Sequence, residues 1–524
     1  MRVRGAIACL VALALAGCGI GAPWDLGRTP GAEAPAPTRT PGPPPTSPDR
    51  PSPPVPDVRP PGVTTPPPGT GLARYREQPV RWEDCRHDNG TFHCARVQAP
   101  LDRADPDGDA LTLSLLKVPA TAEPRLGTIF VNPGGPGEGG TGLATRFARQ
   151  GLEQYDIVGW DPRGTGDSTP VVCGSDEQLD EFFETDTSPD DPNERQQVIE
   201  INREYGAACL AGSGRLLHHI STIDTVADLD LMRELVGDEK LNFFGYSYGT
   251  DIGSRYAHLH SDRVGRMALD GAVDVTDSRE TIQAMGFDRA LEAFADWCVE
   301  RRCSLGADRA AVIGSVTGLF DRLDAAPLSV QDRDLTQSQA VTGVVVTLYG
   351  AEEEWRYLLA ALERARNGDG RLLLQLADFY NDRRADGGYG TRTVAFSAIR
   401  CLDEGDHGIV ATEEEAAEDA QKAPIFGPYF GVDYVCPTWP VAPIPRPEPV
   451  VAAGAPPILV IGSTGDSATP YEHAQAMAEQ LDSGVLLTYR GAGHGAYGGQ
   501  SACVNNAVVS HFVDKPRTRQ KTCR

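Results

Sequence analysis

The sequence predicts an α/β fold with a mostly parallel sheet and a large, mainly helical cap inserted before the last two strands. Short apolar runs, mostly β-branched, are typical of strands buried on both faces, and helical patterns lie between several of them. This alternation stops after Leu269 and resumes near Ile458. The predicted strands are Leu111–Val118, Thr128–Asn132, Asp156–Trp160, Leu241–Phe244, Arg266–Leu269, Ile458–Ile461 and Val485–Tyr489.

The segments between the strands indicate the helices and the domain boundaries. Thr222–Val236 places its apolar residues near one face, behind the capping hydroxyl of Ser221. We expect residues 72–274 and 456–524 to form the α/β domain and residues 275–455 the cap. The cap is rich in helix-forming residues over 351–366 and 371–381. About 450 residues is more than one compact core usually holds, which supports this division.

The N-terminus is typical of an exported chain. Residues 1–17 combine Arg2 and Arg4 with an apolar run that is too short to span a bilayer. This segment ends at Cys18 in a lipobox-like pattern, so we expect lipid on Cys18 and anchoring to the outer face of the cell membrane. The alternative is an ordinary cleavable signal and a secreted protein. Residues 18–71 contain many prolines, which predicts an extended tether.

The net charge limits the classes of binding partner that we expect, and the cysteine content indicates the cellular compartment. A net charge of −25 argues against nucleic-acid binding. Besides Cys9 and Cys18, ten cysteines remain, which indicates disulfides in an exported chain. Proximity favours the neighbouring pairs Cys85–Cys94, Cys173–Cys209, Cys298–Cys303, Cys401–Cys436 and Cys503–Cys523, although sequence alone does not fix connectivity. No cysteines form C-x-x-C pairs and no histidines cluster with them, so we expect no metal and no cofactor.

A serine between two glycines gives the first indication of chemistry. Gly245-Tyr-Ser-Tyr-Gly249 follows an apolar strand and precedes a helix, as in the G-x-S-x-G nucleophile elbow. Earlier in the chain, Pro133-Gly-Gly-Pro-Gly137 follows another strand, where a glycine loop brings backbone N–H groups close to a substrate. We expect Ser247 to be a nucleophile, with an oxyanion hole formed by the N–H groups of Gly135 and Tyr248.

An acid and a histidine follow the serine in the order that such a site requires. Asp466 lies in a turn-rich loop after the strand Ile458–Ile461, and His494 lies between glycines after the last predicted strand. We expect His494 to be the general base and Asp466 to orient it. Asp270, directly after the strand ending at Leu269, is the rival acid.

Together these motifs resemble those of a known family. Asn132-Pro-Gly-Gly-Pro-Gly137 and Asp161-Pro-Arg-Gly-Thr-Gly-Asp-Ser168 are similar to segments of prolyl aminopeptidases. With the serine, aspartate and histidine motifs, they resemble the exported actinobacterial tripeptidyl-aminopeptidase-like branch of the α/β-hydrolases. Asn132 departs from the histidine of prolyl aminopeptidases, and we assign Asp161 and Arg163 to shaping a turn.

The resemblance implies an envelope serine exopeptidase that removes short peptides, with tripeptides as the expected length, from free N-termini of peptide or protein substrates. Such an enzyme needs a cap carboxylate to pair with the substrate ammonium, for which Glu353, Glu354 and Asp403 are the candidates. The same triad also suits an envelope esterase or lipase. A third hypothesis is a non-enzymatic binding protein that keeps an inactive hydrolase fold, but the intact triad disfavours it.

Overall fold

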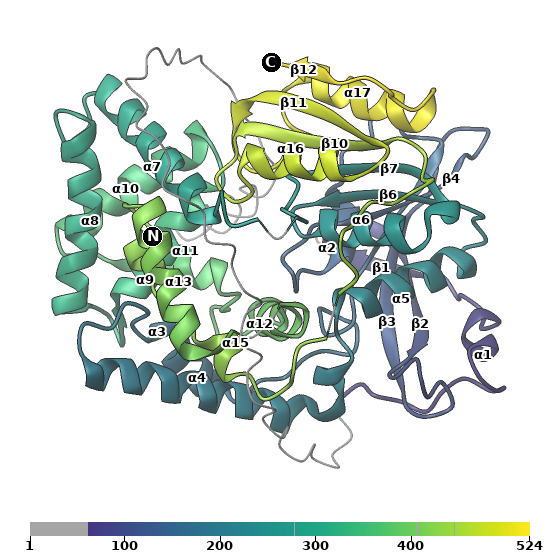
Figure 1. Ribbon diagram of the computed structural model, residues 1–524, viewed down its shortest axis with the longest axis horizontal. Helices are drawn as coiled ribbons and strands as arrows, with labels where there is room; N and C mark the ends of the chain where they lie inside the picture. The colour runs from purple at the N-terminus through teal and green to yellow at the C-terminus, as the bar shows by residue number, and fades with distance from the viewer. Residues whose placement is uncertain (1–60, 88, 277, 405–406, 445) are drawn as a thin grey trace, which may run out of the picture.

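The computed structural model describes residues 61–87, 89–276, 278–404, 407–444 and 446–524, so the expected signal, Cys18 and most of the tether lie outside it. A ten-stranded sheet runs through the molecule in the order β1-β2-β3-β5-β4-β6-β7-β10-β11-β12 (Figure 1). All pairs from β5 to β12 are parallel, and those among β1, β2, β3 and β5 are antiparallel. The strands are β1 (Glu83–His87), β2 (Gly90–Pro100), β3 (Ala110–Val118), β4 (Gly127–Asn132), β5 (Tyr155–Trp160), β6 (Leu241–Tyr246), β7 (Val264–Asp270), β10 (Ile458–Gly465), β11 (Gly484–Ala492) and β12 (Lys521–Cys523).

The seven predicted strands are present, and three further strands of this sheet were missed. β1 and β2 form an antiparallel hairpin at one edge, and β1 is largely exposed and polar, so it lacks an apolar signal. β12 pairs with β11 through three residues only. Three strands therefore follow the cap, not two.

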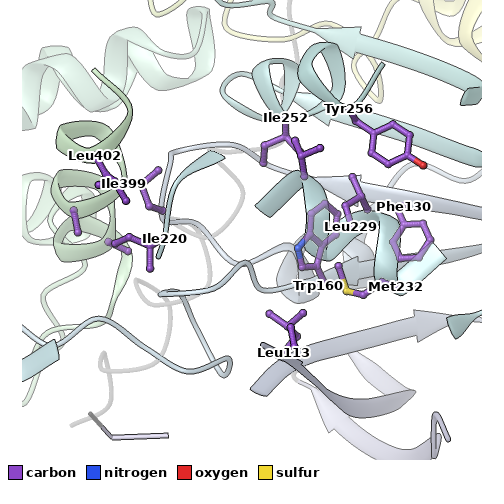
Figure 2. Close-up of a cluster of buried hydrophobic side chains, with 14 of the residues drawn as sticks. Leu113, Phe130, Trp160, Ile220, Leu229, Met232, Ile252, Tyr256, Ile399 and Leu402 are labelled. Atoms are coloured by element: carbon purple, nitrogen blue, oxygen red, sulfur yellow. The ribbon is translucent and has the colours of Figure 1, made fainter. Parts of the chain in front are cut away.

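Alternating side chains of each buried strand contribute to two cores. Ile129 packs with Leu143 of α2 (Gly140–Arg146) and Val508 of α17 (Ala502–Val513) on one face. Phe130 joins the opposite core, where Figure 2 shows it near Trp160, with Leu229 and Met232 of α5 (Thr222–Leu235) and Ile252 and Tyr256 of α6 (Gly249–Leu259). The sheet is therefore covered by helices on both faces, as continuous apolar strands require.

The cap consists of two parts with different packing. One has its own core and contains α7 (Gln283–Glu300), α8 (Arg309–Ala325), the hairpin β8 (Leu328–Val330) and β9 (Arg333–Leu335), α9 (Gln337–Leu348), α10 (Glu352–Arg366), α11 (Arg371–Tyr380) and α14 (Gly427–Phe430). The other contains α12 (Arg392–Asp403) and α15 (Val435–Thr438). Ile399 and Leu402 of α12 join the core of the α/β domain (Figure 2). Thus α12 is built into the domain that carries the predicted nucleophile.

The remaining helices connect or flank these parts. The smaller insertion contains α3 (Asp176–Glu184) and α4 (Pro192–Ser213). The others are α1 (Ala73–Arg76), α13 (Gly408–Lys422) and α16 (Tyr471–Gln480).

The folded α/β domain begins before the expected boundary at residue 72. Thr64 pairs with Ala110, whose carbonyl accepts the Thr64 N–H at 2.7 Å, and Val63 is buried. Thr169 Oγ1 also donates to the Gly62 carbonyl at 2.9 Å. These contacts add residues 62–64 to the edge of the domain, despite the proline-rich composition that precedes them.

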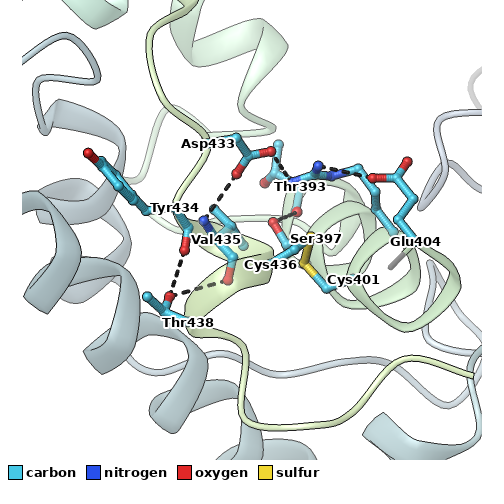
Figure 3. The surroundings of a disulfide bond; sticks show 10 residues. Thr393, Ser397, Cys401, Glu404, Asp433, Tyr434, Val435, Cys436 and Thr438 are labelled. Carbon is cyan, nitrogen blue, oxygen red and sulfur yellow. Dashed lines mark hydrogen bonds and ion pairs between the residues drawn. A yellow bond between two sulfur atoms is a disulfide. The ribbon is translucent and has the colours of Figure 1, made fainter. Parts of the chain in front are cut away.

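Within the described residues, five disulfides join Cys85–Cys94, Cys173–Cys209, Cys298–Cys303, Cys401–Cys436 and Cys503–Cys523, which are the neighbouring pairs that proximity favours. Figure 3 shows the Cys401–Cys436 bond, which links α12 to α15 within the cap. Such bonds fit an oxidising compartment. Throughout the described residues, no helix combines the length and apolar character needed to cross a membrane.

The buried His511 makes stability depend on pH. Burial lowers its pKa to about 4, so it stays neutral in the fold over a range where the unfolded chain binds a proton. Its contribution is complete above pH ~6.5 and is lost as pH falls toward 4. We predict that His511→Gln removes up to about 3 kcal/mol of the pH dependence of unfolding, measured by urea denaturation between pH 4 and 7. The exposed His87 gives the control His87→Gln, and an unchanged slope in His511→Gln would contradict the prediction.

Candidate active site

The turn between β6 and α6 holds Ser247 in a left-handed conformation with φ of 53°. The Ser247 N–H donates to the Asp270 carbonyl at 2.9 Å, and its own carbonyl accepts the Thr250 N–H at 2.8 Å. A Cβ added to Gly245 would lie 2.3 Å from the Gly249 oxygen, so no larger residue fits there without a shift. The expected elbow geometry is thus present, with a strained, non-glycine residue at its tip.

The glycine loop after β4 lies against this turn. A Cβ on Gly134 would be 2.9 Å from both Ser247 Cβ and Tyr248 N. Asn132 Oδ1 accepts the Gly134 N–H at 2.9 Å, which gives this residue a role in fixing the loop. Among the described residues, no acceptor takes the N–H of Gly135 or Tyr248. Neither predicted oxyanion donor is therefore occupied by an acceptor from the described part of the protein, and the Tyr248 N–H belongs to the residue directly after Ser247.

Asp466 and His494 are brought together by the loops that follow β10 and β11. His494 Nδ1 lies 2.9 Å from Asp466 Oδ1, and that carboxylate also accepts the Ala468 and Thr469 N–H groups at 3.0 and 2.8 Å. Thr469 Oγ1 lies 3.2 Å from the same ring nitrogen. With Nδ1 engaged by the carboxylate, Nε2 is the nitrogen left to exchange a proton.

The electrostatic environment favours the protonated imidazole. Burial alone would lower the pKa of His494, but the charges of Asp466 and Asp270 and the Asp466 hydrogen bond outweigh it and raise this pKa. A base with a raised pKa accepts a proton from a serine hydroxyl more readily.

Asp270, the rival acid, serves the histidine loop in a different way. Its carboxylate accepts the N–H groups of Ala496 and Tyr497 at 2.8–3.1 Å and makes no hydrogen bond to the His494 ring among the described contacts. Burial raises the pKa of Asp270 to about 6. Asp466 thus binds the imidazole of His494, whereas Asp270 binds the backbone that follows His494.

The two turn-shaping residues also lie in the α/β domain. Asp161 accepts the Thr141 and Asp167 N–H groups at 3.1 and 2.9 Å. Arg163 is fully buried and donates to both oxygens of Asp228 at 2.7 Å. Neither touches the triad in the described contacts, consistent with a structural role.

The cap contacts the glycine loop after β4 and the histidine loop. On α12, the backbone of Arg392 and Phe396 passes so close to Gly137 that an added Cβ would lie 2.3 Å from the Arg392 oxygen. Tyr349, which follows α9, accepts the His494 N–H with its carbonyl at 2.9 Å. Neither contact has a local signal in the sequence, because both join segments that are distant along the chain.

The three carboxylates expected to bind an amine occupy different places. Glu353 is exposed near the start of α10, whereas Glu354 accepts the Ala351 N–H at 3.0 Å and thereby caps its own helix. Asp403, at the end of α12, is buried and accepts the Thr222 N–H at 3.0 Å. The Thr222 hydroxyl bonds both Asp403 and the Tyr248 hydroxyl. Only Asp403 is thus linked to the residue beside Ser247.

The cysteines of the described residues do not support a metal site. In the described part of the chain, Cys85, His87 and Cys94 form the one group of potential ligands close enough to share an ion. A disulfide joins both sulfurs, which removes them as thiolate ligands.

The strained serine backbone generates a prediction about stability. We expect Ser247→Gly and Ser247→Ala both to abolish acyl transfer. Glycine enters the left-handed region freely, so the Gly variant should exceed the Ala variant by about 1 kcal/mol in free energy of unfolding. Urea denaturation and fluorophosphonate labelling measure the two effects. Equal stability of the two variants would show that the turn is not strained.

The two aspartates should differ in their effect on turnover. Asp466→Asn should lower kcat by roughly 10³- to 10⁴-fold, since it loses the charge that orients and stabilises the imidazolium. Asp270→Asn keeps an oxygen for the Ala496 and Tyr497 N–H groups and should cost less than ~10-fold. Both are measured as kcat on a chromogenic acyl ester. The reverse order would make Asp270 the acid of the triad.

Known proteins are similar to this chain over most of its length. A family model described as TAP-like protein matches residues 423–523. Serine protease Hip1 of Mycobacterium tuberculosis is 34% identical over 479 residues, which cover 84% of this chain and 91% of the relative. Carboxylesterase B of the same organism is 32% identical, covering 83% and 87%. Tripeptidyl aminopeptidase of Streptomyces lividans is 27% identical, covering 86% and 88%.

These relatives, together with the observed strand order, confirm the predicted fold class and enzyme class. Long matches that cover most of both chains leave little room for a different architecture. The chain belongs to the tripeptidyl-aminopeptidase-like family of the α/β-hydrolases and is a serine hydrolase.

Proposed function

We propose that this protein is a cell-envelope serine exopeptidase that releases short peptides, with tripeptides as the expected length, from free N-termini. The observation that carries this proposal is the hydrogen bond between Asp466 and His494, and the left-handed backbone of Ser247 supports it. The relative named tripeptidyl aminopeptidase supports the substrate class.

The geometry supports a two-step acyl transfer. Ser247 Oγ attacks the peptide carbonyl while His494 Nε2 takes its proton, and the N–H groups of Gly135 and Tyr248 stabilise the oxyanion. Asp466 holds the Nδ1–H tautomer and stabilises the imidazolium. His494 then gives the proton to the leaving amine. Water, deprotonated by the same nitrogen, releases the acyl group from Ser247.

Recognition of a free N-terminus requires a carboxylate at a set distance from the serine. Asp403 is the candidate that the contacts favour, because it adjoins Tyr248 through Thr222. Burial raises the pKa of Asp403 to about 7, which an approaching ammonium would lower again. Glu354 is engaged by its own helix and Glu353 is exposed, so both rank below it.

A carboxylesterase is the second candidate, since the same catalytic residues cleave esters. The relative named Carboxylesterase B, which matches 83% of this chain, is the observation in its favour. For location, we propose attachment through lipid on Cys18. This residue lies outside the described part of the structure, and the support is its lipobox-like context and the disulfides.

Peptidyl amides of two, three and four residues, with free and acetylated N-termini, distinguish the candidates. We expect cleavage to need a free amine and to be fastest at three residues. Short acyl esters are tested in parallel. Ester turnover without peptide cleavage would contradict the exopeptidase and support the carboxylesterase.

The Asp403→Asn variant tests amine recognition. We expect the KM for free-amine tripeptidyl amides to rise by at least roughly 30-fold, the lower end of the loss typical of a buried charge pair, with ester turnover retained. In the wild-type enzyme that KM should also rise as pH falls below about 7, where Asp403 becomes protonated. Glu353→Gln is the matched control on the same cap. An equal fall in kcat on every substrate would instead assign Asp403 to supporting Tyr248.

A further inference from the structure

We infer that the helical cap completes the catalytic machinery through Tyr349, which acts as the positioning residue for His494. This inference rests on the proposed triad and not on the exopeptidase specificity. It gives the cap a part in the chemical step besides substrate recognition.

Two separate contacts join Tyr349 to the histidine. The Tyr349 carbonyl accepts the His494 N–H at 2.9 Å. The two rings meet edge to face, with centroids 5.5 Å apart and an interplanar angle of 86°. One contact fixes the backbone of His494 and the other restricts its ring, so together they limit where Nε2 can point.

The histidine needs such support because of its own loop. Gly493 and Gly495 flank it with φ of 97° and 79°, a conformation that glycine enters without strain. Asp466 holds Nδ1 from one direction. A ring held at a single nitrogen can still rotate about that hydrogen bond, and Tyr349 contacts the ring from the cap.

Tyr349 is itself firmly held. It follows α9, whose residues Val341, Val344 and Leu348 lie in the core of the cap. Its ring packs against Phe287 of α7 at 5.5 Å, and its hydroxyl lies 3.5 Å from that of Tyr380. The His494 N–H also satisfies a carbonyl at the C-terminal end of α9, where the partial negative charge of the helix favours an imidazolium.

The charged and titratable groups around the imidazole come from three elements. Asp466 follows β10 and Asp270 ends β7, and both raise the pKa of His494. Tyr349 comes from the cap, with Tyr380 and Arg392 behind it. Burial lowers the pKa of His494, against the effect of the two carboxylates, and is the largest single contribution to its shift. Removing the Tyr349 ring should weaken that effect by letting water reach the imidazole.

Tyr349→Ala and Tyr349→Phe test the inference on p-nitrophenyl acetate, a small ester that does not depend on peptide recognition. We expect the Ala variant to lose roughly 10- to 100-fold in kcat, as for other small misplacements of a catalytic group, with KM changed little. The acid limb of its kcat/KM profile should move to higher pH. The Phe variant keeps the ring and should stay within ~2-fold of wild type in kcat.

Two further variants keep the test decisive. Tyr349→Leu preserves apolar volume if the Ala variant is poorly folded, and we expect the same loss of kcat from it. Tyr357→Ala removes a tyrosine of α10 that is 43% exposed, and should leave kcat unchanged. Thermal unfolding is measured for every variant. Wild-type kcat and an unmoved acid limb in both Tyr349→Leu and Tyr349→Ala would overturn the inference, even if their melting temperatures fell.

These outcomes are separable from the proposed exopeptidase activity. If peptidyl amides are not cleaved but the ester results follow the expectation, the positioning role of Tyr349 stands and the proposed substrate class fails. If peptides are cleaved and Tyr349→Leu is unaffected on both substrates, the exopeptidase stands and the positioning role fails.

Discussion

The left-handed backbone of Ser247 is the constraint around which the catalytic centre is arranged. Strand β6 must end and α6 must begin within a few residues, and this leaves no volume at Gly245 for a side chain. The turn is held from the neighbouring strand, because the Ser247 N–H binds the Asp270 carbonyl. It also leaves the Tyr248 N–H free, since that residue precedes the helix. Ser247, the Tyr248 N–H that we propose as an oxyanion donor, and the position of Asp270 are thus fixed by one piece of backbone.

Asp466 and Asp270 lie in the same region but have different hydrogen-bond partners. Asp466 faces the imidazole ring, whereas Asp270 faces the backbone of the segment that follows it. Both charges act on His494 across a region shielded from water, where electrostatic interactions are strong. The histidine is therefore held by one carboxylate directly and by the other through its loop, with the cap carbonyl of Tyr349 closing the third side.

Features encoded by neighbouring residues could be predicted from the sequence, and features that join distant segments could not. The seven buried strands and the order of Ser247, Asp466 and His494 follow from local apolar runs and glycine-bounded motifs. The β1–β2 hairpin was missed because β1 is polar and exposed, and β12 because it is only three residues long. The separate packing of α12 and the Tyr349–His494 contact depend on tertiary structure alone.

The cap leaves the sheet after β7 and returns at β10, and these two strands are hydrogen-bonded neighbours. A segment whose two ends meet on adjacent strands can be lengthened, shortened or replaced during evolution without changing the order of the sheet. In this chain such a replacement would also remove the acceptor that the Tyr349 carbonyl provides for the N–H of His494.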